Sequence, residues 1–422
     1  MVATVFGLAL ILRLAVAIRS PVWMHDDGVG YDQVARSIVR GEGFVRDGRP
    51  TAAEDPLYPI FLAVVYRVAG THLLSVRSVQ SVLNAAACSV VAALGVWMGG
   101  PAVGWLSGLF AACYPSLVRL SCHWLSEALF IPLLVFALAA WVLWQRRPRL
   151  RWALLTGGLF GLAALTRSSV ALLPLLLAWL AWRRAMEWKT VAVHWHVGLM
   201  LIAMVLTVAP WTIRNWLAFH EVIPISTKTG LDLYASYFPP EGKLFGLTPV
   251  DENMAAARAM TSETHASAFL IAKTWEFIVH QPKEALRLLL LKALFLVTPF
   301  DWEILGYRVY NVGYSLMVPW AVAGLWLSQR RRLAVEPLTA LVAYYLVLML
   351  ATYGSPRLRL PVEPVLLVFA ALACVVWFQQ VGRWSVGLAT VAAWCAIHLA
   401  IWWNSEALYL LCRRAVVHAR LW

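Results

Sequence analysis

Long apolar segments alternate with short polar ones along almost the whole chain. A helix of about 20 residues crosses a hydrocarbon core of about 30 Å, and the strict polar-apolar alternation of a membrane barrel is missing. The pattern therefore predicts an all-α, polytopic bundle of about 11–13 transmembrane helices, with a further segment at 284–299 that spans, re-enters or lies flat. The apolar runs lie near 2–18, 79–98, 102–113, 127–144, 152–167, 168–182, 190–210, 309–328, 335–352, 361–378 and 385–403.

Composition excludes an ordinary soluble protein. Hydrophobic residues make up 61% of the 422 residues and charged residues 14%, whereas roughly 25% of residues are charged in a soluble domain. No repeat of fixed period and no low-complexity linker divides the chain. We expect one membrane domain over 1–422, a first outer loop at 19–78 and a long outer loop at 211–283.

The positive charge is concentrated in three short loops. The net charge of +13 comes largely from arginine and lysine clusters at 146–151, 183–189 and 330–332. Basic loops between membrane helices usually face the cytoplasm, so membrane topology explains this charge and nucleic acid is not an expected partner. Counting helices from these loops places 19–55, 114–125, 211–283 and 353–361 together on the outer side.

The six cysteines lie mostly in or beside apolar runs, with no CxxC spacing among them. They predict neither a disulfide framework nor a zinc site. No Walker loop is present either, so ATP is not an expected substrate.

The first outer loop carries the strongest candidate for chemistry. Asp26 and Asp27 are adjacent carboxylates near a low-dielectric boundary, where charge is costly unless it binds or catalyses something. Tyr31 follows Asp27 at a helical spacing. A carboxylate here can act as a general base, or hold a divalent cation against a phosphate. The alternative is structural: Asp27 caps a helix that begins near Gly28.

Other outer segments add an acid and several cations. Glu127 either sits in the first turn of a helix capped by Ser126 or reaches the same cavity as Asp27, with His123 nearby. Arg214 is either an interfacial anchor or a phosphate ligand. Arg357 and Arg359 lie on the outer side, against the usual bias, and guanidinium groups bind phosphate in a bidentate manner. Within the apolar runs, snorkelling explains Arg167 and explains Arg13 less well.

Taken together, these features resemble the GT-C glycosyltransferases that use lipid-linked sugars, specifically the bacterial branch grouped with protein O-mannosyltransferases and aminoarabinose transferases (glycosyltransferase family 39-like). The matching motifs run in the family's order over nearly the whole chain. They are Asp27 with Tyr31, Gly41-x-Gly43-Phe44, Pro50-Thr51-Ala52, Pro56-Leu57-Tyr58-Pro59, Ser126-Glu127, Pro210 to Asn215, Ile225-Ser226-Thr227 with Gly230, and Arg357 to Pro361.

The resemblance implies an enzyme of the bacterial inner membrane, with its site facing the periplasm or cell exterior. It would transfer a hexose or pentose from a polyprenyl-phosphate donor to a lipid, glycan or protein acceptor. No cofactor is required; a divalent cation, Mg²⁺ or Mn²⁺, is left open, with Asp27 and Glu127 as its ligands. The expected site consists of Asp27 as general base with Asp26 and Glu127, the donor-phosphate ligands Arg214, Arg357, Arg359 and Lys228, and the pocket residues Tyr31, Tyr58 and His123.

Two departures from the family and two other functions remain open. Many relatives have Asp-Glu where this chain has Asp27-Gly28, and Thr-Asn-x-Gly where it has Thr227-Lys228-Thr229-Gly230. The alternative functions are a transporter or lipid flippase, and an O-antigen ligase or polymerase-like enzyme that uses a lipid-pyrophosphate glycan.

Overall fold

The structure is a computed structural model that describes residues 1–20, 26–188, 191–238, 251–297, 300–301, 309–352, 356–381, 392–397 and 400. Helices dominate these residues, and strands occur only as two short antiparallel hairpins. The first half contains α1 (Val2–Arg19), α2 (Asp26–Val39), β1 (Val45–Arg46), β2 (Arg49–Pro50), α3 (Leu57–Ala69), α4 (Leu73–Gly99), α5 (Pro101–Cys113), α6 (Pro115–Leu120), α7 (Glu127–Arg146), α8 (Leu150–Thr166), the 3-10 turn η1 (Ser168–Val170), α9 (Leu173–Trp188) and α10 (Val191–Phe219). The second half contains α11 (Thr229–Tyr237), α12 (Glu252–Ala259), α13 (Glu263–His280), α14 (Pro282–Val297), β3 (Phe300–Asp301), β4 (Val309–Tyr310), α15 (Val312–Arg330), α16 (Glu336–Ala351), α17 (Pro356–Arg359) and α18 (Glu363–Val381).

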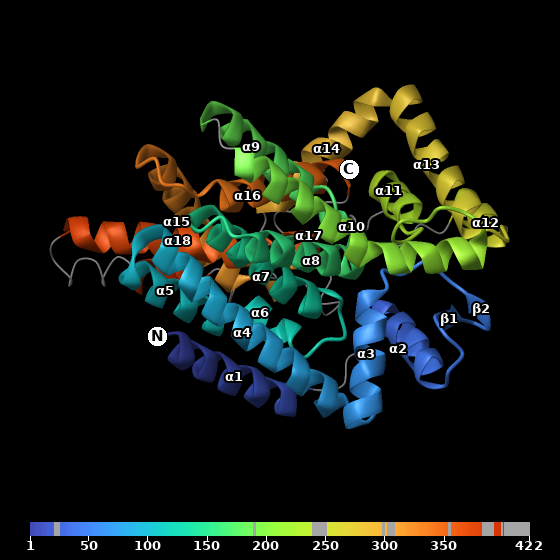
Figure 1. The fold of residues 1–422 in the computed structure, drawn as a ribbon, viewed down its shortest axis with the longest axis horizontal. Helices are drawn as coiled ribbons and strands as arrows, with labels where there is room; N and C mark the ends of the chain where they lie inside the picture. Colours follow the sequence, from blue (N-terminus) through green and yellow to red (C-terminus); the bar gives the residue numbers. More distant parts are fainter. Residues whose placement is uncertain are drawn as a thin grey trace.

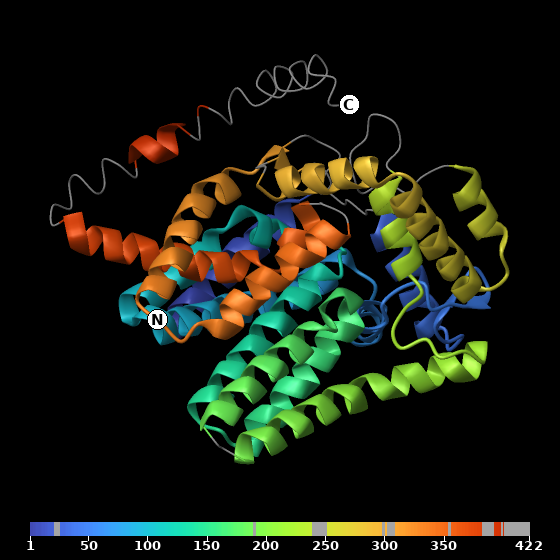
Figure 2. The same cartoon turned by 90° about the horizontal axis from the view of Figure 1, so that it is seen from above.

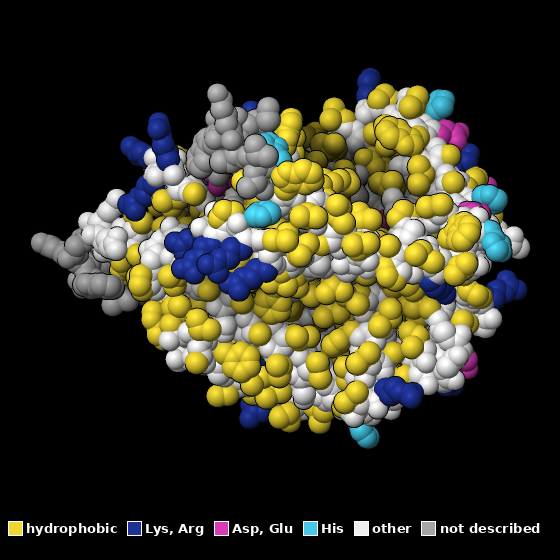
Figure 3. All heavy atoms as spheres, in the orientation of Figure 1, with side chains coloured by type: hydrophobic (Ala, Val, Ile, Leu, Met, Phe, Trp, Pro, Cys, Tyr) yellow, Lys and Arg dark blue, Asp and Glu magenta, His cyan; other side chains and the backbone are white. Residues whose placement is uncertain are grey.

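The expected all-α, polytopic membrane fold is confirmed. Among the described helices, α1, α4, α7, α10 and α18 are long and apolar enough to cross a membrane, and several shorter apolar helices accompany them. Hydrophobic side chains also cover most of the face drawn in Figure 3, with Lys and Arg in compact groups. The expected helix at 385–403 falls largely outside the described residues. The segment at 284–299 forms most of α14, which does not count among these candidate spans.

Close helix packing depends on glycine at several crossings. α4 packs against α1, α5 and α7, α10 packs against α8, and α15 packs against α18 (Figures 1 and 2). A Cβ added at Gly157 would lie 2.0 Å from the Met200 carbonyl oxygen, and one at Gly324 would lie 1.8 Å from that of Phe369. Small residues at these positions therefore let the helix backbones touch, as is typical of membrane bundles.

Arg13 belongs to this packing. Its buried guanidinium donates to the carbonyl oxygens of Ala9, Ala111 and Ala112 and to the Cys88 sulfur, all at 3.2 Å. The charge is thus held among backbone acceptors between α1, α4 and the end of α5. Arg13 therefore has a structural explanation that snorkelling did not supply.

Elements from the two expected outer loops, 19–78 and 211–283, gather at one end of the molecule. α2, α3, the β1–β2 hairpin and α11 to α13 lie together on the right of Figure 1, beside the end of α10. The Glu263 carboxylate at the start of α13 fastens the first outer loop to this group. It accepts hydrogen bonds from the Thr51 hydroxyl (2.7 Å), the Ala52 amide (2.9 Å) and the Thr227 hydroxyl (3.2 Å).

Candidate active site

The start of α2 positions Asp27. The helix begins at Asp26, so Asp27 lies in its first turn and is not the N-cap of a helix starting at Gly28; the capping alternative is wrong for that reason. The Asp26 side chain lies outside the described part of the structure. A Cβ added at Gly28 would meet the Trp124 carbonyl oxygen at 3.0 Å. The glycine therefore lets α2 rest on the backbone that leads into α7.

Arg357 joins Asp27 to Glu127 across distant parts of the chain. Its Nη1 donates to Asp27 Oδ2 at 2.7 Å, across 330 residues of sequence. Its Nε donates to Glu127 Oε1, and its Nη2 donates to Glu127 Oε2 at 3.2 Å. Three outer segments that the sequence placed on one side of the membrane thus meet at a single guanidinium.

Arg167 is a second cation on Glu127. Its Nη1 donates to Glu127 Oε1 at 2.6 Å, from the residue that follows α8. The interpretation of Arg167 as a snorkelling side chain is therefore wrong, because its guanidinium forms an ion pair with the buried Glu127 carboxylate. Glu127 does begin α7, as expected, and Ser126 also contacts its Oε2, at 3.3 Å.

Asp27 and Glu127 differ in access. The Glu127 side chain is 0% exposed and that of Asp27 is 30% exposed. In the part of the chain that the structure describes, Asp27 Oδ1 accepts no hydrogen bond. Burial alone would raise the pKa of Asp27, but the charges of Lys228 and Arg357 outweigh it and hold that pKa well below its usual range. Asp27 is therefore an ionised carboxylate that a substrate can reach.

Two further acids lie close by and were not predicted. Ser226 Oγ donates to Asp55 Oδ1 at 2.8 Å, and the Ser168 amide donates to Oδ2 at 3.3 Å. Glu54 faces Lys228 Nζ at 3.7 Å and Arg46 at 3.5 Å. Burial raises the pKa of both acids. They directly precede the Pro56-Leu57-Tyr58-Pro59 motif, and that adjacency is the signal that could have identified them.

Lys228 is the predicted phosphate ligand with the simplest surroundings. It precedes α11, where the Thr227 amide donates to the Ala52 carbonyl oxygen at 2.9 Å and so brings the lysine beside Glu54. Burial alone would lower its pKa, but the charges of Glu54 and Asp27 raise it well above its usual range. Lys228 is thus a fixed cation next to Asp27.

Arg214 and Arg359 lie in other surroundings. Arg214 donates to the carbonyl oxygens of Phe44 (2.7 Å) and Thr51 (2.9 Å), so it holds the first outer loop. The Arg359 guanidinium lies 3.6 Å from the centre of the Tyr314 ring and pairs with Glu363 at 3.2 Å. Their role as phosphate ligands stays a prediction, and the structure does not bring them to the Asp27 carboxylate by any contact.

The predicted pocket residues form a connected layer beneath α2. The rings of Tyr31 and Tyr58 meet edge to face with centroids 5.1 Å apart. Tyr58 donates to Gln80 at 2.8 Å, and Gln80 donates in turn to the His123 carbonyl oxygen at 3.1 Å. This layer supports the start of α2, and so the position of Asp27, from below.

The site does not fit a divalent cation between Asp27 and Glu127. A carboxylate offers about four lone-pair positions, and Glu127 receives donors from Arg167, Arg357 and Ser126 on both oxygens. The Arg357 guanidinium lies between the two acids. Among the described residues, no group of three or more His, Cys, Asp or Glu could hold a metal ion.

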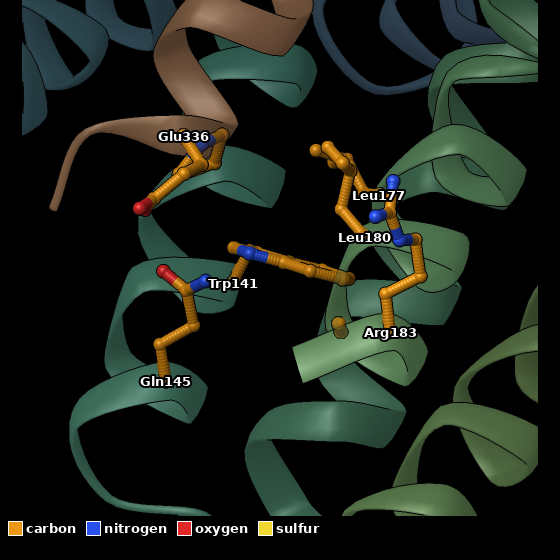
Figure 4. A pocket seen from close by; sticks show the side chains of 8 residues that line it. Trp141, Gln145, Leu177, Leu180, Arg183 and Glu336 are labelled. Carbon is orange, nitrogen blue, oxygen red and sulfur yellow. The ribbon is translucent and has the colours of Figure 1, made fainter. Parts of the chain in front are cut away.

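A separate cavity of about 200 Å³ lies at the other end of α7. Figure 4 shows the Trp141 ring reaching across it, with Gln145 and Glu336 on one side and Leu180 and Arg183 on the other. Trp141 follows Glu127 by 14 residues, about 21 Å along a helix. This cavity is therefore distinct from the Asp27 site.

Comparison with known proteins agrees with the fold, and a family match covers part of the chain. Residues 50–211 match the family model described as dolichyl-phosphate-mannose-protein mannosyltransferase. This match includes Glu54, Asp55, Glu127 and Arg167. A search of curated proteins found no match.

Solved structures of the oligosaccharyltransferase from Archaeoglobus fulgidus share the fold. The apo form has a TM-score of 0.57 at 14% identity, over 95% of this chain and 54% of that one. The form with Zn and sulfate has a TM-score of 0.55 at 14% identity, over 94% and 51%. The AglB complex with an inhibitory peptide and a dolichol-phosphate has a TM-score of 0.52 at 14% identity, over 95% and 54%.

The chain thus spans about half the length of these oligosaccharyltransferase structures. The charged site lies in an integral membrane protein with the GT-C fold, and the resemblance drawn from the motifs is confirmed.

Proposed function

We propose that this protein is a glycosyltransferase that moves a monosaccharide from a polyprenyl-phosphate donor to a lipid, glycan or protein acceptor. The observation that carries the proposal is the meeting of the reachable Asp27 carboxylate with the cations Lys228 and Arg357. A base beside fixed cations suits a reaction that deprotonates an acceptor and releases a phosphate. The AglB neighbour, which is recorded with a dolichol-phosphate, supports a lipid phosphate as the ligand class.

The reaction we propose is a direct, inverting displacement at the anomeric carbon. The acceptor hydroxyl or amine gives its proton to Asp27, through Oδ1, as its oxygen or nitrogen bonds to that carbon. The bond from the carbon to the phosphate oxygen breaks, and the phosphate keeps the electron pair. Lys228 stabilises the departing charge, because its ion pair with Glu54 in the described part of the chain, at 3.7 Å, is longer than a hydrogen bond and leaves its ammonium able to contact the phosphate.

The fixed acids and arginines have positioning roles in this proposal. Arg357 holds Asp27 in place and ionised, and Glu127 with Arg167 holds Arg357. Asp55 ties the first outer loop to Ser168 and Ser226. We place the site on the periplasmic or outer side of a bacterial inner membrane, because the arginine-rich loops at 146–151, 183–189 and 330–332 favour the cytoplasm.

The test uses isolated membranes that contain wild-type or Asp27→Asn protein and a panel of polyprenyl-phosphate hexoses and pentoses. Loss of each donor is followed by mass spectrometry, and labelled sugar is followed in lipid, glycan and protein fractions. We expect wild type to consume one donor and Asp27→Asn to lose about a hundredfold to ten-thousandfold in rate, the usual contribution of a general base. Asp47→Asn is the matched control, since Asp47 is exposed in the same loop.

The same assay separates the alternatives. Consumption of a lipid-pyrophosphate glycan only would favour a ligase or polymerase. Movement of a lipid-linked sugar into sealed vesicles with no covalent product would favour a transporter or flippase. Full transfer activity in Asp27→Asn would remove the assignment of the base.

A further inference from the structure

The space between Asp27 and Glu127 is filled by a side chain of the protein itself. In many phosphate-handling sites a pair of carboxylates holds Mg²⁺ or Mn²⁺, which keeps several waters and meets the substrate phosphate. Here the guanidinium of Arg357 contacts both carboxylates: it donates to Asp27 Oδ2 at 2.7 Å and to both oxygens of Glu127. The two acids are therefore already bridged by a cation.

The acceptor capacity of Glu127 is used up by this arrangement. Its Oε1 receives Arg167 Nη1 and Arg357 Nε, and its Oε2 receives Arg357 Nη2 and the Ser126 hydroxyl. The four donors match the four lone-pair positions of a carboxylate, and the side chain is 0% exposed. A metal ion would have to displace two arginines from a buried acid.

Local charge also disfavours a divalent cation at this position. Arg357 and Arg167 pair with Glu127, and the charge of Lys228 also acts on Asp27. A divalent ion placed between the acids would stand within a few ångströms of these like charges, in a partly buried site where screening by water is weak. Replacement of the guanidinium by a neutral side chain would instead leave two adjacent carboxylates without their shared cation.

We propose that Arg357 takes the place of a divalent cation at the site, so that Asp27 and Glu127 bind no metal ion in the wild-type protein and form a metal site only when the guanidinium is removed. The inference deepens the proposed function, on which its catalytic meaning rests. Arg357 then supplies a fixed positive charge that, unlike a metal ion, a chelator cannot remove, and Lys228 is left to bind the donor phosphate.

The test is a Mn²⁺ titration of detergent-purified protein, in which the free Mn²⁺ is measured by electron paramagnetic resonance. We expect wild type to bind no Mn²⁺ that depends on Asp27, and Arg357→Ala to gain about one equivalent. The double variant Arg357→Ala with Asp27→Asn should lose that equivalent. Arg357→Lys, which keeps a positive charge at the position, should gain none.

Arg359→Ala is the matched control, because it removes an arginine from the same short helix. Arg359 pairs with Glu363, and among the described residues no hydrogen bond or ion pair joins it to Asp27 or Glu127. We expect no Mn²⁺ to be gained in this variant. A gain equal to that of Arg357→Ala would mean that loss of any positive charge attracts the metal, which would overturn the proposal.

Two other results would overturn it. One is wild-type protein that binds Mn²⁺ or Mg²⁺ and loses it on Asp27→Asn; the other is folded Arg357→Ala that binds none. If Arg357→Ala does not fold, the wild-type titration alone decides, since it compares only wild type with Asp27→Asn. Mn²⁺ binding is measured without any sugar donor, so failure of the glycosyltransferase assignment would appear in the donor assay and not here.

Discussion

Two pairs of carboxylates lie at the same end of this molecule and are held in opposite ways. Asp27 and Glu127 are joined by arginine, and Lys228 and Arg357 keep the pKa of Asp27 well below its usual range in spite of burial. Glu54 and Asp55 are buried with a lysine at 3.7 Å and with serine donors, and their pKa values are raised by that burial. At Asp27 the neighbouring cations outweigh burial, whereas at Glu54 and Asp55 burial outweighs the neighbouring cations.

The contrast indicates a division of work. A carboxylate held charged and open to solvent, as Asp27 is, can receive an acceptor molecule at neutral pH. A carboxylate that resists ionisation and accepts hydrogen bonds from two other chain segments, at Ser168 and Ser226, as Asp55 does, suits the fixing of loops. Acids in one site whose environments push their pKa values apart usually have different roles.

We expect the largest effect on stability and activity when Glu127, the buried acid of the pair that Arg357 joins, loses its charge. Glu127→Gln keeps the shape of the side chain but removes the charge that pairs with Arg167 and Arg357. Breaking a buried ion pair from one side costs about 3–5 kcal/mol, because the remaining charges are left without compensation. We expect a strongly lowered thermal unfolding midpoint in detergent and loss of sugar transfer. A midpoint within a few degrees of wild type would show that the arginines find other acceptors.

A smaller effect is expected when a cation is removed from the surroundings of Asp27. Lys228→Met deletes the strongest of the charges that lower the pKa of Asp27. The folded pKa then rises, so Asp27 becomes protonated at a higher pH as the solution is acidified. We expect the acid limb of kcat/KM to move upward by about one pH unit, with a lower maximal rate. The measurement is the pH profile of donor consumption from about pH 2 to pH 8, because the acid limb lies below the usual pKa of an aspartate.

Lys273→Met is the control for that profile. Lys273 pairs with Glu276 on the exposed side of α13, at 2.8 Å. Its loss should leave the acid limb where it is. An unchanged limb in Lys228→Met as well would mean that the lysine does not act on Asp27, and the charged pair would then depend on Arg357 alone.

Much of the fold could be predicted from the sequence, because lipid imposes a local rule on each helix. Apolar runs at 127–144 and 152–167 became α7 and α8 with nearly the expected bounds. Asp27 could also be singled out, since a charged residue near the membrane boundary is costly unless something holds it. These inferences depend only on the local sequence of one segment and on whether lipid or water surrounds it.

The pairing of the charges could not be predicted in this way. Arg167 has an adequate local explanation in snorkelling, and only the approach of α8 to α7 reveals Glu127 as its partner. Arg214 and Arg359 have the charge that a phosphate ligand needs. In the structure, however, Arg214 donates to backbone carbonyl oxygens and Arg359 pairs with Glu363. Contacts across hundreds of residues depend on helix packing, for which sequence spacing carries little signal.

The smallest effect, and the sharpest test of the comparison, is expected at Asp55. The raised folded pKa of this acid means that its stabilising contribution is complete below the unfolded value of about 3.9 and is lost as pH rises through the folded value. Asparagine has no proton to lose and keeps one oxygen for Ser226 or Ser168. Relative to wild type, Asp55→Asn should therefore become more stable as the pH rises from 5 to 8, by less than the loss expected for Glu127→Gln.

Thermal unfolding midpoints of both proteins at pH 5 and pH 8 provide the measurement. Glu127→Gln is the reference, because its loss should be large at both pH values. If Asp55→Asn is destabilised as strongly as Glu127→Gln and equally at both pH values, Asp55 is held as a charged group in the same way as the arginine-bound acids. If Asp55→Asn instead gains stability relative to wild type toward pH 8, burial controls the pKa of Asp55, whereas the neighbouring cations control the pKa of Asp27.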